Sequence, residues 1–383
     1  MPKTYKRVVV ITNVILGYRR PIFESLSAIP DWQLRILLSL PIEKSDRQAQ
    51  EQLPLQYTKS LNFKHRSKHK TMGISQVEPL PIPLTLLIDL WRFCPDIIIS
   101  AEFGVRSILA YLYAWIFKIP FVIWSEATAE QALGISWIQR KLRAYLADKA
   151  SAFLAWGRPA VLYLSSFNVP ANKIYYCAQA VDNHAWSNAS REYDKDKVKN
   201  GIGATGRVFL AVGRMLPLKG FDYFLRAWAL LPEELRMSNT VVFVGSGSEE
   251  NSLRSLAAQY NLPNVLFVGD QTADALAKYY AGADVLVVPS LVDVWGLVIN
   301  EALACGLPVL ASRYAGASGE LIGDTGAGEV FDPHDIPAFT AMLERWCIKE
   351  SWMSQSDLLN VVSRFDFNTS INAFKRVVNT FLD

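Results

Sequence analysis

The sequence predicts an α/β protein built from two arrays in which parallel strands alternate with helices. Short apolar runs that suit buried parallel strands recur in both halves, and each is followed by a helical pattern. The chain has 383 residues, about twice the length of a typical domain. Apolar residues make up 51% and charged residues 20%, which excludes a disordered chain. We therefore expect two α/β domains.

In the first half, residues 7–12, 33–38, 96–100 and 121–124 read as strands, and residues 21–26 lie in a helix that Pro21 begins. Residues 107–124 approach the length of a membrane span, but Lys118 and Pro120 interrupt them. We expect a buried helix to Phe117, a turn, and a core strand from Phe121.

The weakest patterning lies at residues 187–206, which are charged and contain glycine but few apolar side chains. We place the domain joint there. The expected organisation is an N-terminal domain at 1–186, a linker at 187–206, a C-terminal domain at 207–366 and a last helix at 367–383.

Two carboxylates mark a candidate site in the second half. Residues 284–289 read as a buried strand, residues 290–296 as a loop ending at Gly296, and a helix begins at Leu297. The free amides of Leu297 and Val298 can hold a diphosphate. Glu301 can then accept hydrogen bonds from a ribose, and Asp293 from a second polyol. A solvated loop carboxylate with an ordinary helix glutamate explains this pair equally well.

A second candidate anion site lies upstream, after the strand expected at residues 208–212. Gly213 permits a tight turn directly after the strand, and Arg214 can donate two hydrogen bonds to phosphate oxygens. Lys219 adds a positive charge where the next helix begins. Surface charge at a strand end is the alternative. The combination with the paired carboxylates favours a diphosphate site.

Five segments of the second half, taken together, resemble a known family. They are residues 212–220, 242–247, 264–269, 283–290 and 301–309, and they resemble the retaining GT-B glycosyltransferases of the GT4 group. The resemblance implies two Rossmann-like domains with a deep interdomain cleft, and a C-terminal helix that crosses back onto the N-terminal domain.

The resemblance also implies roles for residues of the donor half. Arg214 and Lys219 match the pair that binds the donor diphosphate, Glu301 matches the ribose ligand, and Asp293 matches the carboxylate that contacts the transferred sugar. The family generally has Glu at that last position. Two further segments would border the nucleotide base, mainly through their backbone atoms. They contain Gly245, Gly247, Gly269 and Gln271.

Catalysis in such enzymes needs no protein nucleophile. The resemblance assigns transition-state stabilisation to Arg214, Lys219 and the amides of Leu297 and Val298. Residues 315–322 resemble the loop that closes over the donor, and we expect Ser318 in it to cap a helix.

The acceptor side is expected in the N-terminal domain. Glu126 and Glu102 each follow a predicted strand, and Glu126 matches the region where the family often has His. Either carboxylate can orient the acceptor or cap a helix. The opening loop contributes Gly17, Tyr18 and Arg19, and its arginines suit an anionic acceptor.

Charge separates the two halves. Residues 1–190 carry 22 Lys and Arg against 13 Asp and Glu, a balance of +9, whereas residues 191–383 carry 17 against 23, a balance of −6. The basic residues at 59–70 and 140–143, with Trp137 nearby, favour an anionic membrane surface over a purely solvated face. A nucleic-acid partner ranks last because no recognition motif is present.

The four cysteines and four histidines show no metal-ligand spacing, so we expect no metal and no cofactor, with a nucleoside diphosphate sugar as substrate. The N-terminus has charge but no apolar signal region, which favours a cytoplasmic protein. The basic residues of the N-terminal domain favour a peripheral location on the cytoplasmic face of the membrane.

The sequence thus predicts a retaining glycosyltransferase that moves a sugar from a nucleoside diphosphate to a glycan or lipid-linked acceptor. A catalytically inactive nucleotide-sugar-binding protein, a GT-B phosphorylase and a basic nucleic-acid module are the alternatives.

Overall fold

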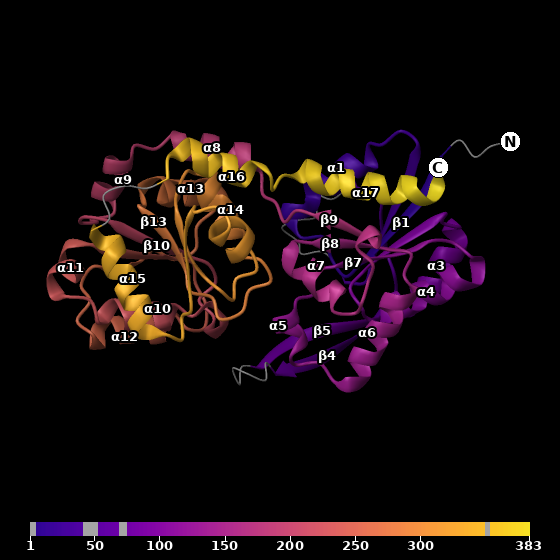
Figure 1. Ribbon diagram of the computed structural model, residues 1–383, viewed down its shortest axis with the longest axis horizontal. Helices are drawn as coiled ribbons and strands as arrows, with labels where there is room; N and C mark the ends of the chain where they lie inside the picture. Colours follow the sequence, from indigo (N-terminus) through magenta and orange to yellow (C-terminus); the bar gives the residue numbers. More distant parts are fainter. Residues whose placement is uncertain (1–4, 41–52, 69–74, 349–352) are drawn as a thin grey trace. The chain divides into compact units, whose positions relative to one another are not determined.

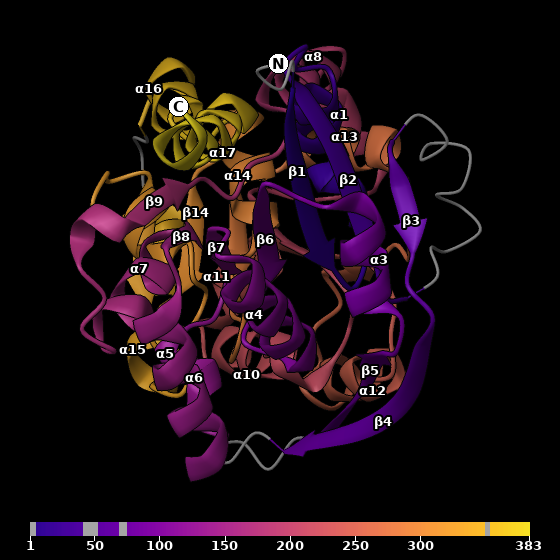
Figure 2. The same cartoon turned by 90° about the vertical axis from the view of Figure 1, so that its right-hand side faces the viewer.

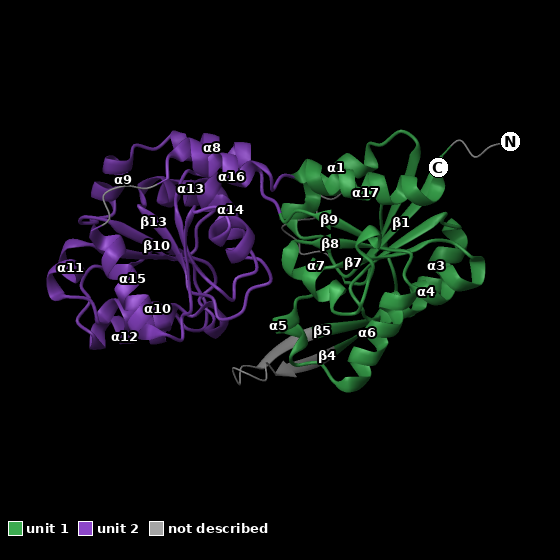
Figure 3. Cartoon of the chain, in the orientation of Figure 1, with its two compact units in different colours: residues 1–179, 367–383 green, residues 180–366 purple. Residues whose placement is uncertain are grey.

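The computed structural model describes residues 5–40, 53–68, 75–348 and 353–383, without side chains for residues 64–78. Two compact units appear, coloured green and purple in Figure 3. The N-terminal unit comprises residues 1–179 and 367–383, and the C-terminal unit comprises residues 180–366.

The N-terminal unit is built on a seven-stranded parallel sheet in the order β3-β2-β1-β6-β7-β8-β9 (Figure 1). Its strands are β1 (Lys6–Thr12), β2 (Trp32–Leu38), β3 (Leu55–Tyr57), β6 (Ile97–Ala101), β7 (Phe121–Ser125), β8 (Ala152–Trp156) and β9 (Ile174–Cys177). A separate antiparallel hairpin joins β4 (Ser60–Lys68) to β5 (Ser75–Pro83).

Helices cover both faces of this sheet. The helices α1 (Arg20–Ser27) and α17 (Phe367–Leu382) share one core with it. The other core contains α3 (Leu86–Phe93), α4 (Val105–Phe117), α6 (Trp137–Lys149) and α7 (Arg158–Ser165). The shorter elements are η1 (Gly17–Arg19), α5 (Ala129–Ala132) and η3 (Ala171–Lys173).

The last helix returns to the N-terminal unit, as expected. Phe374 on α17 is fully buried, and its ring centroid lies 6.2 Å from that of Trp124 on β7. Buried apolar residues of α17 thus complete the core over this face of the sheet.

The C-terminal unit has a six-stranded parallel sheet in the order β12-β11-β10-β13-β14-β15. Its strands are β10 (Val208–Val212), β11 (Thr240–Val244), β12 (Val265–Phe267), β13 (Val285–Val288), β14 (Val309–Ser312) and β15 (Gly328–Phe331). Its helical elements are α8 (Asn183–Arg191), α9 (Lys195–Gly201), η4 (Pro217–Lys219), α10 (Phe221–Ala229), α11 (Glu233–Ser238), α12 (Glu250–Gln259), α13 (Ala273–Gly282), α14 (Leu297–Ala304), η5 (Ser318–Gly323), α15 (Ile336–Ile348) and α16 (Gln355–Ser363).

The expected linker at 187–206 is different in the structure, because most of it is helical. Asp182 caps α8 by accepting from the Ala185 amide at 2.9 Å, and Asp194 caps α9 in the same way. Both helices contact α13 within the C-terminal unit. The charged composition reflects the exposed side of these helices, and the unit boundary lies earlier, at Gln179 and Ala180.

The expected strands and the turn before β7 are confirmed to within one residue. The helix α4 ends at Phe117, Lys118 adopts a left-handed conformation with φ 53°, and β7 begins at Phe121. In each sheet the strand order reverses beside one strand, β1 in the first and β10 in the second. Ligands of open α/β sheets bind at the carboxyl ends of strands at such points.

Candidate functional site

The loops that follow β10 and β13 meet at the point of strand-order reversal in the C-terminal unit. The Leu291 amide donates to the Leu218 carbonyl oxygen at 2.8 Å, which ties the two loops together. Across this junction, Lys219 Nζ lies 2.5 Å from Asp293 Oδ2. Both side chains are partly exposed, with 25% and 17% of their surfaces accessible to solvent. The structure therefore brings together two of the residues that the sequence assigned to one donor site.

Close backbone contacts explain why glycines border this site. A Cβ at Gly245 would lie 2.1 Å from the Gly213 carbonyl oxygen, and one at Gly247 would lie 2.4 Å from that of Met215. The Gly245 amide in turn donates to the Gly269 carbonyl at 2.9 Å. The loops after β10, β11 and β12 thus pack backbone to backbone, where a side chain at Gly245 or Gly247 would not fit.

The start of α14 presents a candidate anion site beside this junction. Gly296 precedes the helix with φ 92°, a conformation that favours glycine. The amides of Leu297 and Val298 have no acceptor within the helix, because the first turn never does. Asp293 Oδ2 lies 3.8 Å from the place where a Cβ on Gly296 would be. Its carboxylate is therefore held between Lys219 and the positive end of α14.

Three further hydrogen bonds fix the loop that carries Asp293. The Asp293 amide donates to the Tyr314 carbonyl at 3.1 Å, and the Gly316 amide donates to the Asp293 carbonyl at 3.2 Å. Buried Trp295 donates through Nε1 to Asn300 Oδ1 at 2.8 Å. These supports could not be predicted from the sequence, because spacing alone does not reveal hydrogen-bond partners.

Arg214 and Gln271 complete the predicted donor residues. Arg214 is exposed on the loop after β10, and its side chain makes no ion pair with the part of the chain that the structure describes. The Gln271 side chain points toward its own loop, where Nε2 donates to the Val268 carbonyl oxygen at 3.0 Å. Arg214 is thus available to a ligand, whereas Gln271 is bonded to its own loop.

Glu301 is bound to a residue that sequence reasoning missed. Tyr280 on α13 donates its hydroxyl to Glu301 Oε2 at 2.7 Å. Burial raises the pKa of Glu301, and the Tyr280 hydrogen bond offsets part of that rise. One carboxylate oxygen is fixed in this way, and the side chain retains acceptor capacity for a second donor.

The expectation that Ser318 caps a helix is wrong. The residue before η5 is Ala317, which offers no side-chain acceptor, and Ser318 is buried as the first residue of the turn. The Ala317 amide donates to the Trp295 carbonyl at 2.9 Å, so backbone contacts hold this loop against the loop of Asp293.

In the N-terminal unit, Arg19 and Glu126 form a buried ion pair. Arg19 Nη2 lies 2.5 Å from Glu126 Oε2, and only 7% of the Arg19 side chain is exposed. The guanidinium carbon lies 5.1 Å from the ring centroid of Trp124, and Tyr18 and Trp156 lie against it as well. Burial lowers the pKa of Arg19, but the Glu126 carboxylate outweighs it and the pKa is raised.

This pairing changes the role expected for Arg19. The sequence placed it on the surface as a ligand for an anionic acceptor, but the structure turns it inward to hold Glu126. Trp124 also donates to Glu126 Oε1 at 3.1 Å. Gly17 remains exposed at the start of η1, with nothing within 4 Å of a Cβ placed on it.

Glu102 lies next to this pair, at the end of β6. Its backbone has φ 61°, which is uncommon for a residue other than glycine. Its Oε1 accepts from the Glu126 amide at 2.7 Å. Burial, reinforced by the charge of Glu126, raises the pKa of Glu102 to about 7. Arg106, which sequence reasoning missed, lies near enough to favour the charged form of Glu102, and burial lowers its own pKa to about 10.

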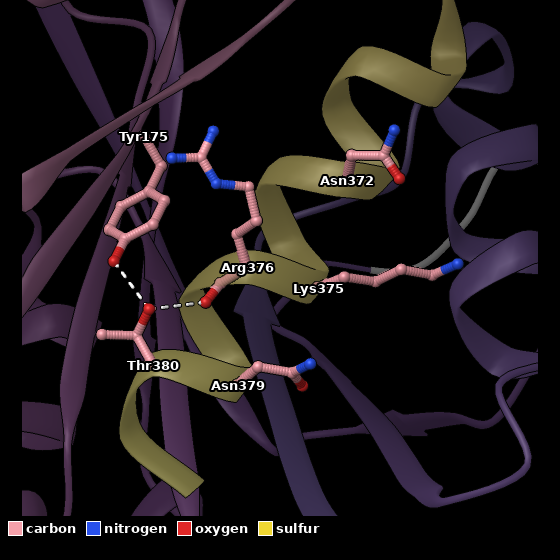
Figure 4. Close-up of a pocket in the computed structure, with 6 residues that line it drawn as sticks. All are labelled: Tyr175, Asn372, Lys375, Arg376, Asn379 and Thr380. Carbon is pink, nitrogen blue, oxygen red and sulfur yellow. Dashed lines mark hydrogen bonds between the residues drawn. The ribbon is translucent and has the colours of Figure 1, made fainter. Parts of the chain in front are cut away.

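A separate cavity of about 680 Å³ lies on the N-terminal unit between β9 and α17 (Figure 4). Arg376 lies over the ring of Tyr175, and the Tyr175 hydroxyl and Thr380 Oγ1 are 2.9 Å apart. Lys375 points away from that pair in Figure 4. None of the predicted site residues lines this cavity.

Within residues 5–40, 53–68, 75–348 and 353–383, no three His, Cys, Asp or Glu side chains gather in a way that could hold a metal ion. The same ranges contain no helix with the length and apolar character of a membrane span.

Comparison with known proteins supports the fold and the family. Residues 192–357 match the family model described as glycosyl transferases group 1. A D-inositol 3-phosphate glycosyltransferase from Mycolicibacterium vanbaalenii is 37% identical over 145 residues, which are 35% of this chain and 32% of that protein. The O-antigen chain mannosyltransferase B of Escherichia coli is 31% identical over 174 residues, 43% of this chain and 45% of that protein. The matches thus span less than half the length of these relatives.

Solved structures match nearly the whole chain. HepE of Anabaena, in complex with UDP, has a TM-score of 0.75 at 18% identity, covering 98% of this chain and all of that one. The lipopolysaccharide outer core galactosyltransferase WaaB has a TM-score of 0.71 at 15% identity, with 98% of this chain and all of that one covered. The chain as a whole therefore has the GT-B fold, and its residues 192–357 are similar to the glycosyl transferases group 1 family.

Proposed function

We propose that this protein is a retaining glycosyltransferase that transfers a sugar from a nucleoside diphosphate to a glycan or lipid-linked acceptor. The observation that carries the proposal is the junction in the C-terminal unit, where Lys219 Nζ and Asp293 Oδ2 meet at 2.5 Å beside the start of α14. A cation, a helix N-terminus and a carboxylate at one strand edge suit a diphosphate that carries a polyol.

In this proposal the diphosphate replaces the Asp293 carboxylate as the partner of Lys219. Arg214 binds a second phosphate oxygen, and the amides of Leu297 and Val298 donate to the diphosphate. Glu301, steadied by Tyr280, accepts from the ribose. Released from Lys219, Asp293 accepts from hydroxyls of the sugar.

The proposed reaction depends on electrostatic stabilisation of the leaving diphosphate and uses no covalent intermediate with the protein. An acceptor hydroxyl forms a new bond to the anomeric carbon as the bond to the phosphate oxygen breaks, and the hydroxyl proton passes to the departing phosphate. Charge that develops on the diphosphate is stabilised by Arg214, Lys219 and the start of α14. No metal is required in this scheme.

The buried pair of Arg19 and Glu126 supports an acceptor site in the N-terminal unit. Arg19 neutralises and fixes Glu126, and Glu102 fixes the Glu126 backbone. In the proposal, Glu126 orients the acceptor hydroxyl, and Arg19 is a positioning residue that does not touch the acceptor.

The proposal is tested by calorimetric titration of the protein with UDP, GDP, ADP and TDP, followed by a donor-hydrolysis assay with sugars of the nucleotide that binds. Binding with slow release of free sugar is the expected result. Binding without any turnover on donor or acceptor favours the inactive nucleotide-sugar-binding protein, and sugar phosphate release that depends on inorganic phosphate favours the phosphorylase.

A further inference from the structure

Two neighbouring helices of the N-terminal unit carry large apolar side chains that are exposed in the described structure. On α3 and the residue before its cap, Leu84, Leu87, Ile88 and Trp91 are 59%, 37%, 50% and 63% exposed. They recur at positions i, i+3, i+4 and i+7, so they form one stripe along the helix. The opposite side of α3 is already buried in the core, which means that this helix is apolar on two sides.

The last turn of the neighbouring helix α4 is also apolar and exposed. Trp115, Ile116 and Phe117 in its last turn are 66%, 56% and 50% exposed. The two helices contact each other and lie side by side in Figures 1 and 2. We name the exposed apolar residues of α3 and α4, with Leu84, the α3–α4 face. A monomeric protein rarely leaves this many large apolar side chains uncovered on two adjacent helices.

Positive charge borders the α3–α4 face. Arg92 and Lys118 are exposed at the ends of α3 and α4. The only carboxylate in these two helices is Asp89, which is buried and accepts from Thr85 and Gln56. The face therefore combines apolar and cationic groups without an exposed acid on either helix.

The helix α6 extends this character. It contacts α4 through Tyr111 and Tyr145, whose ring centroids are 5.9 Å apart. Trp137 and Ile138 at its start are 68% and 61% exposed. Lys141 Nζ lies 4.9 Å from the ring centroid of Trp137, so aromatic and cationic groups are adjacent there too.

We propose that the α3–α4 face, together with the start of α6, docks the protein onto the surface of an anionic lipid bilayer. Leucine and isoleucine enter the apolar boundary of such a bilayer, tryptophans lie at headgroup level, and Lys and Arg meet the anionic headgroups. No spanning helix is needed. The site differs from the basic run at 59–70, of which residues 69 and 70 lie outside the described residues and the side chains of 64–68 are not described.

Charge favours a lipid surface over a second copy of this chain. A two-fold interface would set this same face against its own copy. Arg92 and Lys118 would then lie near identical cations, with no exposed carboxylate on either helix to neutralise them. An anionic bilayer supplies the missing negative charge.

The inference deepens the proposed function, because a lipid-linked acceptor would be presented at such a surface. The two proposals fail separately, since vesicle binding requires neither nucleotide nor turnover.

The test is co-sedimentation of the full chain with vesicles of phosphatidylcholine alone and of phosphatidylcholine with about a third phosphatidylglycerol. The parent protein is expected to bind the anionic vesicles, and the double variant Trp91→Glu with Trp115→Glu to bind them at least ten-fold more weakly. The double variant Leu230→Glu with Ile348→Glu is the matched control, because both residues are 63% exposed, like Trp91, but lie in the C-terminal unit. It should bind as the parent protein does.

A second variant keeps the test decisive if the double variant does not fold. Arg140 and Lys141 are both exposed on α6, and their replacement by Glu should also weaken anionic-vesicle binding about ten-fold. The proposal is overturned if the parent protein does not bind anionic vesicles, or if the folded variants bind these vesicles as strongly as the parent protein does. If the parent protein does not bind vesicles but forms a dimer, and Trp115→Glu abolishes that dimer, the α3–α4 face would instead bind a second copy of the chain.

Discussion

Replacing Asp293 by Asn should strengthen the binding of a nucleoside diphosphate that carries no sugar. In the structure the Asp293 carboxylate is the partner of Lys219 at 2.5 Å and lies at the start of α14. A diphosphate must displace it from Lys219 and then remain beside its negative charge. The Asn side chain has nearly the same shape without that charge.

The magnitude follows from Coulomb's law. A carboxylate about 5 Å from a phosphate oxygen repels it by about 3 kcal/mol at an effective dielectric constant of about 20, and by about 1 kcal/mol at that of water. Since both side chains of the pair are partly exposed, we expect the lower figure. That corresponds to roughly five-fold tighter binding of UDP.

The assay is calorimetric titration of UDP into the parent protein, Asp293→Asn and Glu344→Gln. The last variant removes one exposed carboxylate on α15 and so controls for net charge. In the same series, transfer from the sugar nucleotide should fall in Asp293→Asn because a hydroxyl acceptor is lost. If Asp293→Asn bound UDP with unchanged or lower affinity, the carboxylate would not face the phosphates, and this reading of the junction would be refuted.

Three other variants test the remaining parts of the site. Lys219→Ala should weaken UDP binding about thirty-fold, as the loss of a charge-assisted hydrogen bond of about 2 kcal/mol requires; equal affinity in titration would exclude Lys219 as a phosphate ligand. Glu301→Ala should weaken binding of UDP but leave that of its 2′,3′-dideoxy analogue unchanged, and an equal loss for both would argue against a ribose contact. Glu102→Gln should remove a pH dependence of stability. The folded pKa of Glu102 is raised from 4.5 to about 7, so the parent protein loses up to about 3 kcal/mol of stability as pH rises from 4.5 to above 7. Melting curves of the two proteins should therefore separate only above about pH 5, with the variant more stable, and parallel curves at all pH values would contradict this.

The fold could be predicted closely from sequence because its signals are local. Each parallel strand is an apolar run that is buried on both faces, and β10 and β13 lie where the pattern put them. The domain boundary could not be predicted in the same way. Residues 187–206 are polar on their exposed side, but the caps at Asp182 and Asp194 and the contact with α13 make most of them helical.

The donor residues could be predicted in part, and their partners could not. Strand-end loops of one parallel sheet share an edge, which is why Lys219 and Asp293 could be assigned to one site from sequence. That they bond to each other depends on the hydrogen bond from Leu291 to Leu218, and no sequence spacing reveals such a bond. Tyr280 was missed for the same reason.

Arg19 shows a limit of reading charge from sequence. An arginine in a polar loop resembles a surface ligand, but three aromatic rings and Glu126 bury it. The aromatic residues lie on η1, β7 and β8, so only the folded sheet brings them together.

The most direct test of the donor site is a crystal structure of the protein grown with UDP, or with whichever nucleoside diphosphate binds in titration. The account predicts the diphosphate at the start of α14, within hydrogen-bond distance of Lys219 Nζ, Arg214 and the Leu297 and Val298 amides, with Asp293 released from Lys219. A nucleotide bound elsewhere, with the pair of Lys219 and Asp293 intact, would contradict it.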